Sequence, residues 1–406
     1  MSRLVGAILE AWDELRIHRG RVLLSLVGVG VAVCALTSVV GFGAIAQQAQ
    51  IEELERGSGR PATLVLNTPY NIETGQQADA GLFATAADAV VARYRIDYAG
   101  TVTWLPLSVQ FPDGVSVAES AQSVDVDYGV MHRVRIAEGR WFEERDEARL
   151  APALVVNDAF WQRIGAPDLR THPTVTLIGD RSVTAVIVGV TPPTGWEEGP
   201  RLFVLDSAVA SLVSPEVLAQ NYPQVELWVP PDLAPTLTDL IARDIRAAFG
   251  DEWQVDVMRV DYLGWEGATD PLEPIRLVLA GISVLILLLG ALGLVNISLV
   301  TVRQRVREIG VRRSVGATSG RIFFAVMMES VVATVVAGFV GVIVAIALVR
   351  NPWVLSMLAP GLTDVPPFPV GAALLGLAAA TIVGAIAGLL PALVAVRVKV
   401  IDAIRF

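Results

Sequence analysis

The residues of this sequence with the potential for catalysis do not form a catalytic pattern. Phosphate-binding loops of ATPases place a lysine in the motif G-x-x-x-x-G-K-[ST], and the single lysine of the chain, Lys399, lies outside any such motif. Zinc sites on helices pair histidines as H-x-x-x-H, a spacing that His132 and His172 lack. The sequence therefore predicts no catalytic residue, no metal site and no cofactor bound by the chain itself, which is not expected to be an enzyme.

Carboxylates gather in two places of the long polar segment. One group follows Trp141 and Phe142, and it consists of Glu143, Glu144, Asp146 and Glu147. The other is Asp125 and Asp127, which alternate with valines in what reads as a strand. A charge cluster without histidine or cysteine is usually a solvated surface. We expect the first group to form a solvated turn and the second pair to be exposed on one face of a strand.

Two polar residues interrupt long apolar runs, Glu329 and Asn296. A carboxyl group inside a membrane is costly and invites a functional hypothesis. Three roles remain open for Glu329: anchoring a neighbouring basic loop to the helix bundle, transmitting motion, or reaching the interface by snorkelling. Asn296 is expected to hydrogen-bond between helices. Both are assigned here as transmission or anchor residues.

Residues 303–321 form a short basic loop between two apolar runs. A short helix, Val311–Val315, is predicted after Gly310 and ends at Gly316. Glu308 precedes Arg312 by four residues, the favourable order for an ion pair on a helix. A short helix with an apolar centre and a basic rim suits docking into a cleft of a partner protein, although a solvated loop is the alternative. The predicted docking surface consists of Arg307, Glu308, Gly310, Val311, Arg312, Arg313, Val315, Gly316 and Ala317.

The apolar runs themselves predict a membrane protein. The chain has 406 residues, of which 53% are hydrophobic and 18% charged, whereas soluble domains are about 25% charged. A helix needs about 20 apolar residues to span a bilayer, and four segments meet this length. The first run is longer than the 7–15 apolar residues of a signal peptide, so we expect an uncleaved anchor rather than a cleaved leader. The predicted transmembrane helices are residues 22–46, 275–302, 322–349 and 370–396.

Charge predicts the orientation of these helices. The insert between the first two, residues 47–274, has 16 arginines and 34 acids, so that the net charge of −10 hides a positive remainder. Short basic loops stay in the cytoplasm, which places both termini, the 303–321 loop and the 397–406 tail there. The insert and the 350–369 loop are then outside. Residues 1–21 predict an amphipathic elbow helix on the inner membrane face, or alternatively an early start of the first transmembrane helix.

The insert alternates short apolar runs with helical patterns, which predicts an α+β domain with helical stalk ends. The first helix is expected to continue through Gln47–Arg56. Further helices are predicted at Thr85–Arg95, Asp158–Ile164 and Pro235–Phe249. The predicted strands are Thr63–Asn67, Thr101–Phe111, Ser123–Tyr128, Ala153–Asn157, Thr174–Ile178, Val183–Val190, Leu202–Leu205, Val225–Val229 and Val255–Val260. The fold class is thus an integral membrane α-helical protein with four transmembrane helices and a large α+β extracytoplasmic domain inserted between the first and second.

Small residues recur at every fourth position along the last apolar run. They are Gly376, Ala380, Gly384 and Gly388. Small residues let membrane helices approach closely. The spacing predicts a helix-packing seam, and leaves open whether its partner is in the same chain or in a second copy.

The segment Arg305–Ala317 resembles the R-x-R-E-I-G-x-R-x-x-x-G-A pattern of the MacB/FtsX-type permeases of ABC transporters. The C-terminal runs Gly388–Ala392 and Ile401–Arg405 resemble the closing segment of the same family, although Val400 stands where that segment usually has proline. Within the insert, Glu138–Phe142 resembles a segment of the MacB-like extracytoplasmic domain. The resemblance covers the whole chain in order.

The resemblance implies a type VII ABC transporter in the cell membrane of a bacterium. Two permeases, identical or paralogous, would pair, and each would receive one copy of a separate ATPase subunit, which binds ATP and Mg²⁺, at the docking surface. Movement of the outside domains would drive export or extrusion of a peptide, antibiotic, lipid or lipoprotein. The alternative is an FtsX-like mechanotransmitter that controls a cell-wall hydrolase and moves no substrate. Other expected partners are an extracytoplasmic adaptor or lipoprotein and membrane lipids, but no nucleic acid.

Overall fold

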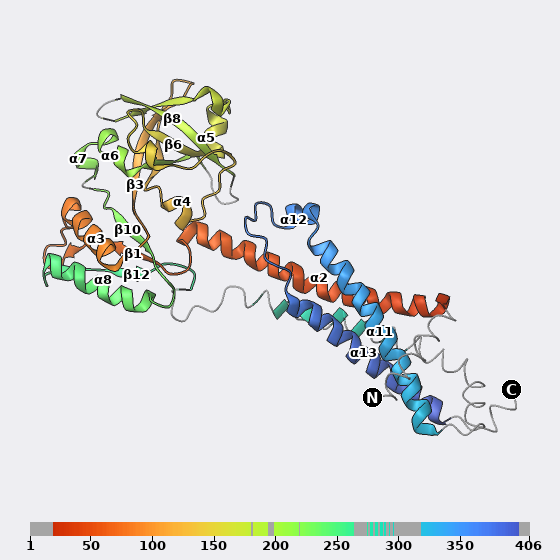
Figure 1. Cartoon of the computed structure of the whole chain (residues 1–406). Helices are drawn as coiled ribbons and strands as arrows, with labels where there is room; N and C mark the ends of the chain where they lie inside the picture. Colours follow the sequence, from red (N-terminus) through yellow and green to blue (C-terminus); the bar gives the residue numbers. More distant parts are fainter. Residues whose placement is uncertain are drawn as a thin grey trace. The chain divides into compact units, whose positions relative to one another are not determined.

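The computed structural model describes residues 19–179, 182–193, 199–218, 220–263 and 318–397, with scattered residues between 274 and 295. The chain divides into two compact units (Figure 1). One comprises residues 1–50 and 269–406, and is called here the membrane unit. The other, Ile51–Ala268, is called the inserted domain.

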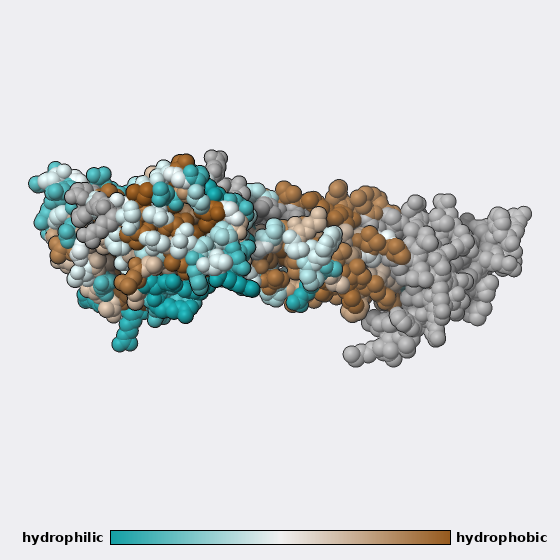
Figure 2. Space-filling view, turned by 90° about the horizontal axis from the view of Figure 1, so that it is seen from above, coloured by the Kyte–Doolittle hydropathy of each residue, from teal (hydrophilic) through white to brown (hydrophobic). Residues whose placement is uncertain are grey.

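Three helices among the described residues are long and apolar enough to cross a membrane. They belong to α2 (Arg19–Ser58), α11 (Ser319–Val349) and α13 (Val370–Arg397). Their outward side chains give this unit a strongly hydrophobic surface (Figure 2). Most of the predicted second helix, 275–302, lies outside the described residues, as does the elbow at 1–18. The count of four membrane helices therefore stays a prediction.

Glycines allow the three helices to approach one another closely. A Cβ atom at Gly376 would lie 2.5 Å from the Thr37 hydroxyl of α2, and one at Gly388 would lie 2.9 Å from the Ser330 Cβ of α11. A Cβ atom at Gly384 would overlap the Thr334 hydroxyl of α11. All three glycines of the predicted seam thus face helices of their own chain in this structure.

The loop between α11 and α13 contains a short helix, α12 (Pro352–Leu358), which begins where Asn351 accepts a hydrogen bond from the Trp353 amide at 2.9 Å. Around α12, Leu355, Ala359, Leu362 and Phe368 form one apolar cluster with Ile45 and Phe42 of α2. The loop is thereby packed against α2 rather than extended.

The inserted domain is built on one ten-stranded sheet (Figure 1). The strand order is β12-β1-β10-β3-β4-β9-β6-β8-β5, and β7 pairs with both β3 and β8. A further two-stranded sheet joins β2 (Tyr70–Asn71) to β11 (Trp253–Gln254). The strands of the large sheet are β1 (Thr63–Asn67), β3 (Tyr98–Gln110), β4 (Ser116–Val124), β5 (Glu138–Gly139), β6 (Ala153–Asn157), β7 (Thr174–Ile178), β8 (Ser182–Thr191), β9 (Arg201–Leu205), β10 (Gln224–Trp228) and β12 (Val257–Arg259).

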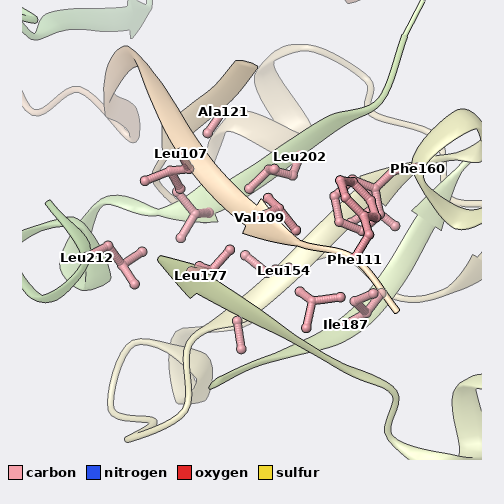
Figure 3. Packing of buried hydrophobic residues seen from close by; sticks show 14 of the residues in the cluster. Leu107, Val109, Phe111, Ala121, Leu154, Phe160, Leu177, Ile187, Leu202 and Leu212 are labelled. Carbon is pink, nitrogen blue, oxygen red and sulfur yellow. The ribbon is translucent and has the colours of Figure 1, made fainter. Parts of the chain in front are cut away.

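Part of the sheet closes on itself, because β7 joins β3 to β8 and completes the ring β3-β4-β9-β6-β8-β7. The core of this ring is apolar and includes Leu107, Leu154, Ile187 and Leu202 (Figure 3). Helices α5 (Asp158–Arg163) and α6 (Asp206–Leu212) contribute Phe160 and Leu212 to the same core. Closure leaves fewer open strand edges.

The remaining strands, β12, β1 and β10 with the start of β3, form an antiparallel layer covered by two helices. These are α3 (Ala80–Tyr94), with Asp79 as N-cap, and α8 (Ala234–Phe249). Phe83 of α3 and Ile241 of α8 are completely buried against Leu64 and Leu227 of the sheet. Two further helices have four residues each: α4 (Tyr128–Met131) follows β4, and α7 (Pro215–Leu218) follows α6.

Several predicted elements have different bounds, and one is wrong. The strand predicted at Ser123–Tyr128 instead ends at Val124 and gives way to α4, while its true beginning is Ser116. Pairing with β3 over Gln110↔Ser116 to Thr103↔Ser123 fixes this strand despite its weak serine- and alanine-rich pattern. The predicted strand at Val255–Val260 is only β12, preceded by the separate β11.

Candidate functional site

Helix α2 continues without interruption into the inserted domain, where its last two turns are fixed by polar contacts. We call this region the stalk joint: residues 51–60 with the segment Tyr128–Arg135 and Glu226. The helix end contributes Glu52, whose side chain is fully buried, and Glu55, which is 4% exposed. Buried carboxylates require a partner, because an unpaired charge in the interior is strongly destabilising.

Two arginines pair with these carboxylates, one on α2 itself and one on the chain after α4. Arg56 pairs with Glu52 at 3.3 Å and also with Glu53 on the same helix. Glu55 pairs with Arg133, which lies just beyond α4. Arg135 is half-buried beside this group, and burial followed by the neighbouring charge of Arg56 lowers its pKa. The ion pair of Glu55 with Arg133 thus joins the stalk helix to the chain after α4.

His132 connects the helix end to the sheet. Its Nδ1 lies 3.2 Å from the carbonyl oxygen of Arg56, and its Nε2 lies 2.5 Å from Oε2 of Glu226 on β10. Tyr128 stacks on the imidazole with ring centroids 4.0 Å apart, and its hydroxyl accepts a hydrogen bond from Gln122. Burial raises the pKa of Tyr128, and the charge of Glu226 adds to the effect. Three elements therefore meet at one buried ring.

The turn after α2 is also tightly held. The Arg60 amide donates to the Met131 carbonyl at 2.9 Å, and the Arg60 Nε donates to the Val130 carbonyl at 2.8 Å. The Arg60 guanidinium lies over the Trp228 ring, 5.1 Å from its centroid. Gly59 has φ +79°, and a Cβ there would lie 2.6 Å from the Thr63 hydroxyl, so this turn requires glycine.

The strand that leaves the inserted domain lies next to the strand that enters it. Strand β12 pairs antiparallel with β1 from Leu64↔Arg259 to Leu66↔Val257, and the Val260 amide donates to the Thr63 carbonyl at 3.1 Å. Just beyond, the fully buried Asp261 accepts two hydrogen bonds from Arg259, at 2.5 and 2.7 Å. Both connections of the domain therefore end on one pair of strands.

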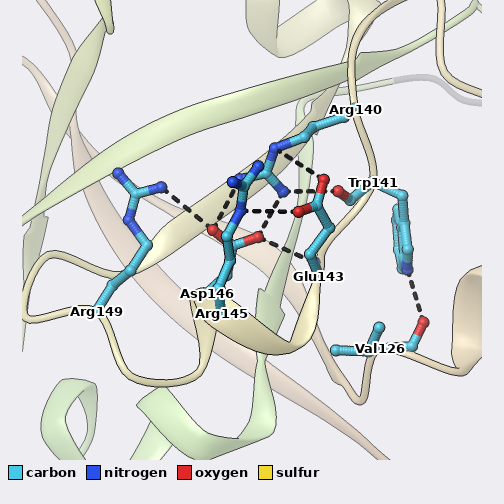
Figure 4. A network of polar contacts seen from close by, with 7 residues as sticks. All are labelled: Val126, Arg140, Trp141, Glu143, Arg145, Asp146 and Arg149. Carbon is cyan, nitrogen blue, oxygen red and sulfur yellow. Dashed lines mark hydrogen bonds and ion pairs between the residues drawn. The ribbon is translucent and has the colours of Figure 1, made fainter.

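The acidic turn after Phe142 corrects one prediction. Glu143, Glu144 and Glu147 are exposed, but Asp146 is buried, with its side chain fully covered. Arg140 donates to both of its oxygens, at 2.5 and 2.8 Å, and Arg149 donates at 3.2 Å (Figure 4). Burial alone would raise the pKa of Asp146, but the hydrogen bonds from Arg140, the Glu143 amide and Arg149 outweigh it and lower the pKa to about 2. The turn is therefore held by hydrogen bonds from Arg140 and Arg149 to the buried Asp146 carboxylate, and we call this contact the Asp146 lock.

Asp125 and Asp127 correct a second prediction, because both are half-buried rather than exposed. Asp125 accepts a hydrogen bond from the Thr101 amide at 2.7 Å, which turns the chain out of the sheet after β4. Burial raises the pKa of Asp125; the Thr101 amide opposes this, and the nearby carboxylates of Asp206, Glu147 and Asp127 add to it, giving about 6. Burial also raises the pKa of Asp127.

We expect Asp125→Asn to stabilise the inserted domain at pH 7.5. A carboxyl whose pKa is raised in the folded state binds its proton more readily when folded, so stability rises as pH falls through 6 toward 4, and the cost is fully present above about 7. The asparagine can still accept from Thr101 and avoids that cost, which is about 2–3 kcal/mol. Thermal melts of the full chain at pH 7.5 and 5 should differ less for the variant than for wild type. Asp88→Asn, at an exposed position of α3, is the matched control, and an unchanged pH response in Asp125→Asn would contradict the assignment.

The residues predicted from sequence lie in different parts of the chain. The docking surface at 307–317 and Asn296 fall outside the described residues. Glu329 lies half-buried on α11. Among the described residues no group of three or more histidines, cysteines, aspartates or glutamates is placed to hold a metal ion. The stalk joint was not predicted at all.

Two family descriptions match the chain, and together they cover most of it. The MacB-like periplasmic core domain matches residues 22–236, and the FtsX-like permease C-terminal family matches residues 280–400. The periplasmic region of MacB from Actinobacillus actinomycetemcomitans aligns with 57% of this chain and 98% of its own length, with a TM-score of 0.39 and 14% identity.

Two relatives that align with nearly the whole of this chain agree with these matches. An uncharacterized ABC transporter permease, YvrN of Bacillus subtilis, is 26% identical, with 96% of each chain covered. The macrolide export ATP-binding/permease protein MacB of Agrobacterium fabrum is 25% identical over the whole of this chain, which spans 61% of that protein. These matches run through both the inserted domain and the membrane helices. The chain therefore belongs to the MacB/FtsX-type family of ABC transporter permeases.

Proposed function

We propose that this chain is a permease subunit that converts ATP hydrolysis by a separate ATPase chain into movement of the inserted domain, and that this movement drives export of a peptide, antibiotic, lipid or lipoprotein. The observation that carries the proposal is the continuity of α2 from its apolar span to the stalk joint. A continuous α-helix is a stiff connection with 1.5 Å rise per residue. A displacement of α2 therefore reaches the sheet through Glu55, Arg56 and His132.

The partners follow from the same proposal. Residues 307–317 would dock into the ATPase, which holds ATP and Mg²⁺, and two permeases with two ATPase copies would form the transporter. The inserted domain would lie outside the cell membrane, where an adaptor or lipoprotein would bind it, with both termini in the cytoplasm. The short basic segments at both termini and at 303–321 support the outside placement of the insert, because short positive loops are retained in the cytoplasm. Glu329 would link the docking loop to the helix bundle.

Charge reversal in the docking loop tests the coupling to an ATPase. The full chain, tagged and extracted in mild detergent, is expected to retain a Walker-motif ATPase in a stoichiometric amount. The single variants Glu308→Arg and Arg312→Glu should each lower this retention at least about tenfold, the effect of losing a buried interfacial charge contact. The double exchange should recover part of the loss if the two residues pair on one helix face.

Arg321→Glu is the matched control, since Arg321 lies exposed on the first turn of α11 and outside the docking surface. It changes the net charge by the same amount and should retain the ATPase. If no ATPase is captured even after chemical cross-linking, or if the reversals in the loop leave it bound, the proposed coupling is wrong.

A further inference from the structure

The contacts of His132 require one proton more than a neutral imidazole beside an ionised carboxylate supplies. Its two ring nitrogens face two acceptors: the Arg56 carbonyl oxygen at 3.2 Å and the Glu226 carboxylate at 2.5 Å. A carbonyl oxygen only accepts, and an ionised carboxylate only accepts, whereas a neutral imidazole has one N–H. A neutral His132 beside an ionised Glu226 can therefore make only one of the two contacts.

Two proton arrangements satisfy both contacts. In one, His132 is an imidazolium that donates to Arg56 and to Glu226. In the other, Glu226 is a neutral acid that donates to Nε2, while Nδ1–H donates to Arg56. Each arrangement contains the same additional proton, and both groups are buried, with His132 3% and Glu226 8% exposed.

Two neighbours of the ring are groups that can contact a cation, and one opposes a further positive charge. The Arg56 carbonyl belongs to the last turn of α2, where the helix dipole attracts cations. Tyr128 stacks on the imidazole at 4.0 Å, and an aromatic face attracts a cation. The other charged groups of the joint are paired: Arg56 with Glu52 and Glu53 on α2, and Arg133 with Glu55. Arg135 lies nearby and would oppose a further positive charge.

We propose that His132 and Glu226 form a proton-dependent latch that fastens the C-terminal turn of α2 to β10. When the proton leaves, the remaining Nε2–H keeps its charge-assisted hydrogen bond to Glu226, because such bonds are the stronger ones. Nδ1 then faces the Arg56 carbonyl with a lone pair. Deprotonation thus releases the contact to the stalk helix and leaves the contact to the sheet. The latch is a property of the inserted domain and does not depend on which ATPase or substrate the chain serves.

Hydrogen exchange of the full-length chain in lipid nanodiscs tests the latch. After correction for the chemical exchange rate, the peptide containing residues 51–60 should open about tenfold more often at about pH 8.5 than at about pH 5.5, the range in which histidines titrate. Tenfold is the fold-change expected for one lost hydrogen bond to a charged group. In Asp125→Asn, which lacks the pH response that Asp125 gives the whole domain, the peptide of β7, whose Val175 and Leu177 pack in the other core, should show no comparable change.

The decisive variant is Glu226→Gln. A glutamine amide can donate to Nε2 of a neutral His132, so both contacts persist without the additional proton. Protection of residues 51–60 should then be independent of pH and should stay high at the alkaline end. A purely structural role of Glu226 would instead weaken the joint at every pH.

Two controls separate this effect from neighbouring acids. Glu53→Gln removes an ion pair of the same helix whose carboxylate is 42% exposed, and it should keep the wild-type pH response. Asp125→Asn removes the carboxyl that titrates near pH 6 in the same domain, and it should also keep the response of residues 51–60. The proposal would be wrong if Asp125→Asn abolished the pH dependence of exchange in residues 51–60, or if Glu226→Gln retained it.

Nitrogen NMR gives an independent measurement if Glu226→Gln fails to fold. The chain has three histidines, so His18→Gln with His172→Gln leaves His132 alone to observe in the full-length protein. At about pH 5.5 we expect either an imidazolium or a neutral ring protonated at Nδ1. A neutral ring protonated only at Nε2 at that pH would overturn the proposal.

Discussion

Replacing Gly341 by leucine is expected to abolish folding of the membrane unit. Gly341 of α11 lies against the backbone of α2: a Cβ atom there would overlap the Gly30 carbonyl oxygen and lie 3.1 Å from the Cys34 amide nitrogen. Backbone atoms cannot move aside as a flexible side chain can, so the two helices would have to separate. Even Gly341→Ala should cost about 1–3 kcal/mol, the range for overpacked sites, and leucine considerably more.

The measurement is the yield and thermal midpoint of the detergent-solubilised full chain on size exclusion. Alanine should lower the midpoint, and leucine should move most of the protein into the aggregate fraction. Gly28→Leu is the control, because Gly28 lies on α2 two residues before Gly30 and no heavy atom of the described residues lies within 4 Å of its would-be Cβ. A monodisperse Gly341→Leu variant with the wild-type midpoint would show that α2 and α11 do not pack as described.

The sequence predicts correctly those strands and helices that are marked by a local pattern of apolar and turn residues. Three strands, β1, β6 and β7, have the predicted bounds, because each is a short β-branched run with turn residues at both ends. The apolar runs of α11 and α13 likewise predict membrane helices from length alone. Helix α3 begins five residues earlier than predicted, since the Asp79 carboxylate caps it by accepting from the Leu82 amide at 3.0 Å.

The stalk joint could not be predicted in the same way. His132 and Glu226 are 94 residues apart in the sequence, and neither stands in a recognisable motif. Each reads alone as a surface residue, and only the antiparallel pairing of β10 with β1 brings Glu226 to the end of α2. One signal was available: three glutamates and an arginine, Glu52 to Arg56, continue the first apolar helix beyond the membrane, which is unusual unless basic residues elsewhere in the fold meet them.

Two carboxylates that were predicted to be solvated, Asp125 and Asp146, are buried or half-buried in the structure. Asp125 and Asp146 both lie in groups of carboxylates that read as solvated, yet both are shielded from water. Their environments differ. Burial raises the pKa of Asp125 to about 6, and no arginine of the described residues pairs with it, whereas Arg140 and Arg149 hold the pKa of Asp146 near 2. Composition reveals neither outcome, because each depends on which backbone amide or guanidinium the fold places within hydrogen-bonding distance.

Replacing Arg140 by alanine is therefore expected to destabilise the inserted domain by about 3 kcal/mol, the lower end of the cost of removing one partner from a buried ion pair. The substitution removes the two short hydrogen bonds to Asp146, whose side chain is fully covered, and leaves Arg149 at 3.2 Å and the Glu143 amide at 3.0 Å. Chemical denaturation of the full chain at pH 7, followed by tryptophan fluorescence, measures the loss.

The control and the pH profile distinguish this lock from an ordinary surface ion pair. Arg145→Ala removes a pair with Glu143 in which both side chains are exposed, 70% and 47%, and such pairs contribute at most about 1 kcal/mol. Because the folded-state pKa of Asp146 is lowered, its stabilising contribution is present above about pH 4 and is lost as pH falls through about 2. Without Arg140 the pKa of Asp146 rises, so Arg140→Ala should be nearly as stable as wild type at about pH 2 and much less stable at pH 7. An equal loss at both pH values would mean that Arg140 acts through its hydrogen bond to the Trp141 carbonyl at 3.0 Å rather than through the charge of Asp146.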